Sequence, residues 1–179
     1  MGVMSAGFVP VRQLVLVDLL SMVLAVRPGE RAVVAVDTAD HAGTARLCAE
    51  LRALAGHVGG REMPTIRASD IGESNVSAVL TLFRAGEPVG VPLEGLHDRE
   101  PLPWRPGEDA VLLVAGVFLL RPALAAHWDA SVYVETETSA SAAEHLYREQ
   151  APEQQATWVL DNRRREAPML TYGASVDPT

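Results

Sequence analysis

Residues 33–47 read VVAVDTADHAGTARL, and this stretch determines the fold that the sequence predicts. It starts with apolar, mostly β-branched residues, which are typical of a buried strand in a parallel sheet. A turn that contains Gly43 follows, and apolar residues then recur at helical spacing, at Leu47, Leu51 and Leu54. We therefore expect a strand, a tight turn and a helix, the unit from which parallel α/β sheets are built.

The turn in this unit has the spacing of a phosphate-binding P-loop, whose pattern is G-x-x-x-x-G-K-[ST]. Aligned with that pattern, Thr38 stands at the first glycine and Gly43 at the second. Thr44 takes the place of the lysine, and Ala45 takes the place of the hydroxyl residue that binds magnesium. The frame of the loop is present, but the side chains that contact phosphate and metal are absent. We expect no cofactor, because ATP and magnesium should bind weakly or not at all.

The rest of the chain also alternates between strand and helix patterns. The expected strands are Arg31–Asp37, Pro64–Ser69, Ala110–Val117, Ala130–Val134 and Thr157–Leu160. The expected helices are Val11–Val26, Ala42–Leu54, Asn75–Arg84, a short one at Pro122–His127, and Ser139–Gln150. This order predicts a three-layer α/β fold with a mainly parallel sheet of about five strands. We expect a single domain over residues 1–179, ordered over about 10–170.

Composition narrows the classes of partner. The net charge of −8 argues against binding to nucleic acid or to an anionic membrane. All fifteen basic residues are arginine, so no lysine elsewhere in the chain can replace the one missing from the loop. Cys48 is the single cysteine and the histidines are scattered, so we expect neither a disulfide nor a metal site. The apolar run over residues 14–26 is shorter than a membrane span of about 20 residues, and no secretory signal is evident, so we expect a cytoplasmic protein.

Further segments follow the first strand and turn in a recognisable order. They are Ile66–Asp70, the run LLVAGVFLLRPAL over Leu112–Leu124, His127-Trp128-Asp129, and Trp158–Asn162. Together they resemble the uridine kinase-like family of P-loop kinases, in the bacterial branch near phosphoribulokinase. That family has a strand and turn that read roughly LLVDGVFL-RPEL. The resemblance covers most of residues 10–170 and implies a P-loop NTPase-like fold.

The chain departs from this family where the family performs phosphoryl transfer. The loop lysine and the magnesium-binding hydroxyl are replaced, as described above. Ala115 stands where the family's strand ends in an acidic residue, and Asp70 is what remains of the acidic motif that supplies the family's general base. The arginine-bearing lid is shortened or absent, with Arg148 as its one plausible remnant. Four parts of the phosphoryl-transfer machinery are thus altered together, namely the loop, the acidic strand end, the acidic motif and the lid, which indicates that selection for kinase activity has ended.

Three residues are candidates for acid–base chemistry in the inherited cleft. His41 replaces a loop residue and titrates near neutral pH, although a solvated loop histidine would look the same. Asp37 and Asp70 end strands that we expect to be neighbours, so that one carboxylate could raise the pKa of the other. The alternative for Asp37 is that it caps N–H groups of the loop.

A second group of residues could bind the ligand. Thr38, Gly43 and Thr44 surround a helix N-terminus, which attracts anions. The remaining candidates are Glu94 and His97 in a proline-rich loop, Arg121 after the GVFLL run, and Arg148. The resemblance places acceptor contacts in that loop and implies that Arg121 anchors the turn. Surface positions are the alternative for Glu94, His97 and Arg148.

The sequence supports three hypotheses of function. The first is a repurposed protein that no longer transfers phosphate, binds a small molecule in the inherited cleft and uses acid–base catalysis, such as cyclisation, isomerisation or elimination. The second is a nucleoside or small-molecule kinase with an unorthodox phosphate site that uses Arg46 or Arg148. The third is a non-catalytic pseudokinase that acts as a sensor or binds a protein partner. A homo-oligomer is compatible with all three.

Overall fold

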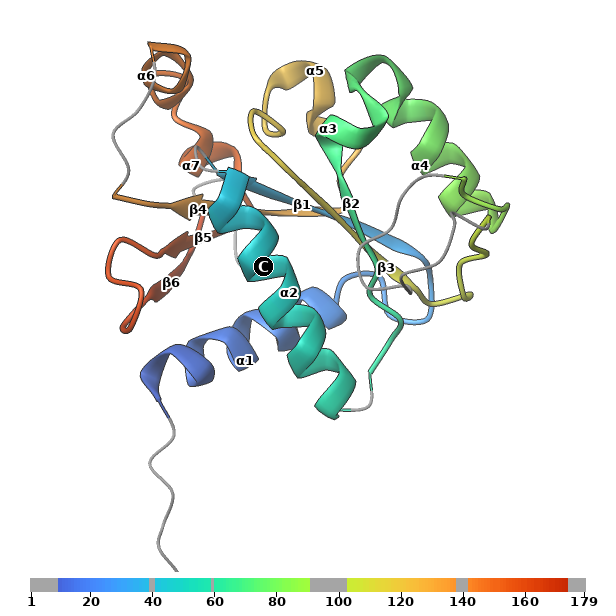
Figure 1. Cartoon of the computed structure of the whole chain (residues 1–179), viewed down its shortest axis with the longest axis horizontal. Helices are drawn as coiled ribbons and strands as arrows, with labels where there is room; N and C mark the ends of the chain where they lie inside the picture. Colours follow the sequence, from blue (N-terminus) through green and yellow to red (C-terminus); the bar gives the residue numbers. More distant parts are fainter. Residues whose placement is uncertain (1–9, 39–40, 59, 91–102, 138–141, 174–179) are drawn as a thin grey trace, which may run out of the picture.

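The structure is a computed structural model that describes residues 10–38, 41–58, 60–90, 103–137 and 142–173. Its centre is a six-stranded sheet with the order β2-β3-β1-β4-β5-β6 (Figure 1). Five strands are parallel, and β6 pairs with β5 in the antiparallel direction. The strands are β1 (Ala32–Thr38), β2 (Thr65–Arg67), β3 (Val111–Gly116), β4 (Ala130–Glu135), β5 (Trp158–Asp161) and β6 (Met169–Tyr172).

The helices that surround the sheet are mostly short. They are α1 (Val11–Leu24), α2 (His41–Val58), α3 (Ala68–Ile71), the 3₁₀ turn η1 (Glu73–Asn75), α4 (Val76–Ala85), α5 (Pro122–Ala125), α6 (Ala142–Arg148) and α7 (Pro152–Gln155). Helix α4 ends at Gly86, whose φ of 74° suits the left-handed position that closes a helix. The mainly parallel α/β fold predicted from the sequence is confirmed.

Strand β1 forms the middle of the core, and all seven of its residues are buried. Its two faces pack into separate apolar clusters, because successive side chains of a strand point in opposite directions. Val34 and Val36 lie in the cluster covered by α1 and α2. Val33 and Ala35 lie in the cluster on the other face, with residues of α4 and of the segment after β3. This burial on both faces explains why the strand reads as a continuous apolar run.

Three differences from the sequence prediction concern the sheet and the helix that follows β1. The sheet has six strands rather than about five, because Met169–Tyr172 forms an antiparallel edge strand. Strand β3 lies between β1 and β2, so the strands that carry Asp37 and Asp70 are not neighbours as expected. Helix α2 reaches Val58, one turn beyond the expected end at Leu54. No described helix is both long and apolar enough to cross a membrane.

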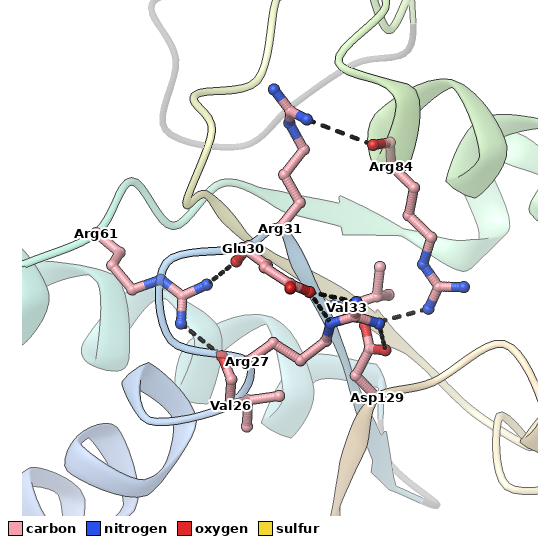
Figure 2. A network of polar contacts seen from close by, with 8 residues as sticks. All are labelled: Val26, Arg27, Glu30, Arg31, Val33, Arg61, Arg84 and Asp129. Carbon is pink, nitrogen blue, oxygen red and sulfur yellow. Dashed lines mark hydrogen bonds and ion pairs between the residues drawn. The ribbon is translucent and has the colours of Figure 1, made fainter.

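Asp129 joins three segments at the amino-terminal ends of the central strands (Figure 2). Its carboxylate accepts hydrogen bonds from the backbone N–H of Val33 at 2.8 Å, and from Arg27 and Arg84 at 3.1 Å each. These partners belong to the loop before β1, to β1 itself and to the last turn of α4. Arg61 donates to the backbone oxygens of Val26 and of other loop residues nearby. The network holds together the amino-terminal ends of the central strands β1 and β4.

Candidate functional site

Asp37 is at the carboxyl end of β1, where ligands of open parallel α/β sheets bind. Its side chain is completely buried, with 0% exposure. The carboxylate oxygen Oδ2 accepts a hydrogen bond from the backbone N–H of Leu120 at 3.1 Å and another from the hydroxyl of Tyr147. The other oxygen, Oδ1, has no hydrogen-bond partner among the described residues. Asp37 therefore faces the protein's own turn and helix α6, and not solvent.

Burial also changes the acidity of this group and its partner. Desolvation raises the pKa of Asp37 to about 6, against the opposing effect of the hydrogen bond from Tyr147. Desolvation and the nearby charge of Asp37 raise the pKa of Tyr147, so that the phenol stays protonated and donates. A buried carboxyl group that titrates near neutral pH is typical of functional sites, although buried structural groups share this property.

The turn after β3 covers Asp37 and is held by contacts along its length. Phe118 has a φ of 61°, an uncommon conformation for a residue with a side chain. Its carbonyl oxygen accepts a hydrogen bond from Nε of Arg121 at 2.9 Å, and the next carbonyl, of Leu119, accepts one from Nε1 of Trp128 at 2.8 Å. The Phe118 ring meets the ring of Tyr147 edge to face, with centroids 4.9 Å apart. Of the two roles weighed for Arg121, the contacts correspond to an anchor for the turn.

The residues that align with the P-loop pattern follow Asp37 in the chain, at the end of β1 and the start of α2. Thr38, the last residue of β1, and Thr44, in the first turn of α2, are both buried, and Gly43 is half-buried. A buried threonine at the lysine position leaves no cationic side chain to reach a phosphate there. His41 begins α2, but its side chain lies outside what the structure describes.

Asp70 is in a different environment from Asp37. It lies in α3, which follows β2, and its side chain is exposed and accepts a hydrogen bond from its neighbour Ser69 at 3.3 Å. Strand β3 separates β2 from β1, so two strand spacings of about 4.8 Å lie between the two strand ends. The expectation that their strands are adjacent was wrong. Adjacent strands therefore do not support their pairing as acid and base, which stays a prediction.

A polar pocket of about 230 Å³ opens beside the sealed carboxylate. We call it the Arg148 pocket; it is lined by Tyr133, Glu135, Thr136, Arg148, Glu153 and Arg163. Arg163 is already engaged, with Nε 2.9 Å from Asp161 and a terminal nitrogen 3.4 Å from Glu135. The backbone carbonyl of Arg148 accepts a hydrogen bond from Ala151, but its guanidinium group makes no hydrogen bond or ion pair with another described residue, and its side chain is exposed. Burial raises the pKa of Tyr133 to about 12, so this phenol stays neutral.

Two of the expected site residues cannot be placed. Glu94 and His97 lie outside the described residues, as does the start of the expected helix at Ser139. Within the described part of the chain, no three histidine, cysteine, aspartate or glutamate side chains gather as metal ligands.

Comparison with known proteins identifies the fold. No family model and no curated protein sequence matches the chain. Among solved structures, a possible uridine kinase from Bacillus stearothermophilus matches with a TM-score of 0.66 and 15% identity, over 83% of this chain and 98% of that one. The chain has the fold of a P-loop kinase. A candidate fructose transport system kinase from Silicibacter sp. TM1040 matches with a TM-score of 0.53 and 16% identity, over 90% of this chain and 87% of that one.

Within this P-loop kinase fold, the sequence prediction missed the side chain that meets Asp37. Tyr147 stands 110 residues after Asp37, in a stretch that was expected only as a polar helix. The usable signal was that Tyr147 is a large aromatic residue in a polar helix, which suggests an anchor to the core. Glu153 was also missed, because a single carboxylate on a short element carries no spacing pattern.

Proposed function

We propose that this chain is a uridine kinase-like protein that has lost phosphoryl transfer and binds a small polar molecule in the Arg148 pocket. The observation that carries the proposal is the burial of Asp37 against Leu120 and Tyr147. A carboxylate that takes part in phosphoryl transfer must face the metal or the attacking hydroxyl group. In this chain the turn after β3 and helix α6 occupy that side of Asp37.

The loss of activity is also supported at the P-loop and at the neighbouring strand. Thr44 is buried at the position of the lysine that stabilises the transferred phosphate, and Ala45 has no oxygen for magnesium. Ala115 is buried near the end of β3, without the acidic side chain that the resemblance implies. Arg46 is exposed on α2, and Arg148 lies across β4 from β1, at the pocket.

The binding proposal is supported by the position and chemistry of the Arg148 pocket. The pocket lies at the carboxyl ends of β4 and β5, and β4 is next to β1 in the sheet. It offers a guanidinium group, at Arg148, that is not neutralised by a described carboxylate. It also offers carboxylates, Glu135 and Glu153, that can accept hydrogen bonds from hydroxyl or ammonium groups. A ligand with an anionic group and hydrogen-bond donors fits this arrangement.

Acid–base catalysis is a second candidate function, favoured by the pKa of Asp37 near 6. It requires that a substrate reach Asp37, and the described structure seals that carboxyl group. Catalysis by Asp37 therefore depends on movement of Tyr147.

A thermal-shift screen tests the binding proposal. The probes are uridine and fructose, which the names of the two structural neighbours suggest, together with inorganic phosphate and a panel of small phosphorylated or carboxylated metabolites. We expect at least one anionic probe to raise the melting temperature in a concentration-dependent way, because a ligand that binds only the folded state stabilises it. A flat response to every probe would contradict small-molecule binding and favour a partner-binding pseudokinase.

A further inference from the structure

Helix α6 is attached to the body of the protein through one described side chain. His145, Leu146 and Arg148 are exposed, whereas Tyr147 is 3% exposed. Figure 1 shows α6 at the periphery of the molecule. Isolated helices shorter than about 12 residues are unstable in water, so this seven-residue helix depends on its tertiary contacts.

The contacts of Tyr147 are specific. Its hydroxyl group donates to Oδ2 of Asp37 and accepts a hydrogen bond from the backbone N–H of Leu120 at 3.2 Å. Its ring packs edge to face on Phe118. A hydrogen bond to a buried carboxylate is stronger than one between neutral groups, so Asp37 contributes much of this attachment.

We propose that Tyr147 is the positioning residue of the Arg148 pocket, and that Asp37 holds it. The next residue in the chain is Arg148, which brings the guanidinium group to a pocket otherwise lined by β4, α7 and the segment after β5. When Tyr147 sits on Asp37, α6 is docked and the pocket has its cation; when it leaves, the pocket loses its cation and Asp37 is uncovered. The ligand group that this arrangement selects is a carboxylate or a phosphate, since both accept paired hydrogen bonds from guanidinium. This inference rests on the binding function proposed above.

The proposal makes ligand binding and helix docking one equilibrium. A ligand that binds Arg148 only in the docked state must favour docking by the same free energy by which docking favours the ligand. An anion in the pocket should therefore protect α6, and a variant that loosens α6 should bind the anion less tightly.

Trypsin cleavage after Arg148 measures the docking of α6 directly. The chain has no lysine, so trypsin cuts only after arginine, and mass spectrometry assigns each cut. When opening and closing are fast, the cleavage rate follows the population of the open state. We expect Tyr147→Phe, which keeps the ring and removes the hydroxyl group, to raise the rate of cleavage at Arg148 about tenfold. Leu146→Ala, at an exposed neighbour on the same helix, should leave that rate unchanged.

A second cut separates local opening from global unfolding. Arg61 donates to backbone oxygens in the core network, so cleavage there reports unfolding of the whole protein. In Tyr147→Phe, cleavage should accelerate at Arg148 and not at Arg61. Equal rates at Arg148 in the variant and the wild type, or an equal increase at both sites, would overturn the positioning role. If Tyr147→Phe does not fold, Asp37→Asn tests the same contact, with a smaller expected increase at Arg148.

Probes tested in the same assay distinguish a phosphate from a carboxylate as the preferred ligand group. They also distinguish failure of the proposed ligand binding from failure of the proposed docking role of Tyr147. Inorganic phosphate and malonate are added separately to the wild type, and protection of Arg148 by one of them identifies the preferred group. Protection by neither, with faster cleavage in Tyr147→Phe, would contradict the ligand class while supporting the docking role. Protection that persists unchanged in Tyr147→Phe would show that the pocket does not need the docked helix.

Discussion

The hydroxyl group of Tyr147 donates a hydrogen bond to Oδ2 of Asp37, which places a side chain of α6 on the carboxyl end of the central strand. The same oxygen accepts the backbone N–H of Leu120, so helix α6 and the turn after β3 converge on one carboxylate. Ligands of this kind of fold bind at the carboxyl ends of the strands. Asp37 lies there, but its hydrogen bonds hold two segments of the protein itself. The following predictions test this arrangement and its consequences.

The stability of the wild type should fall as the pH rises through the range in which Asp37 titrates. Burial raises its pKa from 3.8 to about 6, so between these values the folded state keeps a proton that the unfolded state releases. The free energy of unfolding therefore decreases with rising pH in this window. Asp37→Asn cannot ionise and lacks this decrease. The free energy of unfolding of the variant, relative to that of the wild type, should therefore increase by about 2 kcal/mol from pH 4.5 to pH 7.5.

Urea denaturation of both proteins at these two pH values measures the difference. The comparison cancels the contributions of all other titrating groups, which the two proteins share. A difference that does not change with pH would show that Asp37 keeps an ordinary pKa and is not sealed as described.

Arg148→Gln should weaken binding of any anionic probe that stabilises the wild type. The substitution removes the guanidinium group from the pocket while keeping a polar side chain of similar length. We expect the dissociation constant to rise at least tenfold, because a charge-assisted pair with an anion contributes about 1.5–3 kcal/mol. Arg164→Gln is the matched control, since Arg164 is exposed and does not line the pocket. Equal weakening in both variants would indicate a general charge effect.

Asp129→Ala should lower the free energy of unfolding by about 2–4 kcal/mol. The side chain is 12% exposed, and its loss leaves the N–H of Val33, Arg27 and Arg84 without their shared acceptor. Glu30→Ala is the control, because Glu30 pairs with Arg27 in an exposed ion pair of the kind that contributes little. Chemical denaturation at neutral pH measures both. If Asp129→Ala lowered the free energy of unfolding as little as the control does, the network in Figure 2 would not be what holds the amino-terminal ends of β1 and β4 together.

The buried parallel strands could be predicted because their signal is local. Continuous apolar runs marked β1 and β3, and burial on both faces requires such runs. The edge strand Met169–Tyr172 was missed because it is short and mostly exposed, with no apolar run to distinguish it. The order of the strands was a further limit. No pattern in the sequence near Asp70 predicts that β3 lies between β2, the strand before Asp70, and β1.

The candidate site was harder to predict than the fold. The P-loop positions Thr38, Gly43 and Thr44 follow from a fixed spacing and lie at the end of β1 and the start of α2 as expected. The partner of Asp37 could not be found this way, because contacts between residues far apart in the chain depend on how the elements pack. The sequence indicated at which positions the chain departs from the family that it resembles, and the structure added what occupies the space beside Asp37.

Isothermal titration of ATP and ADP into the purified protein, with and without magnesium, tests the central claim most directly. The claim is that a buried Thr44, the side chain of Ala45 and a sealed Asp37 leave no site for a magnesium nucleotide. We predict no binding heat at millimolar nucleotide, with or without the metal. Micromolar binding that requires magnesium would contradict the account and support the hypothesis that the chain is an active kinase.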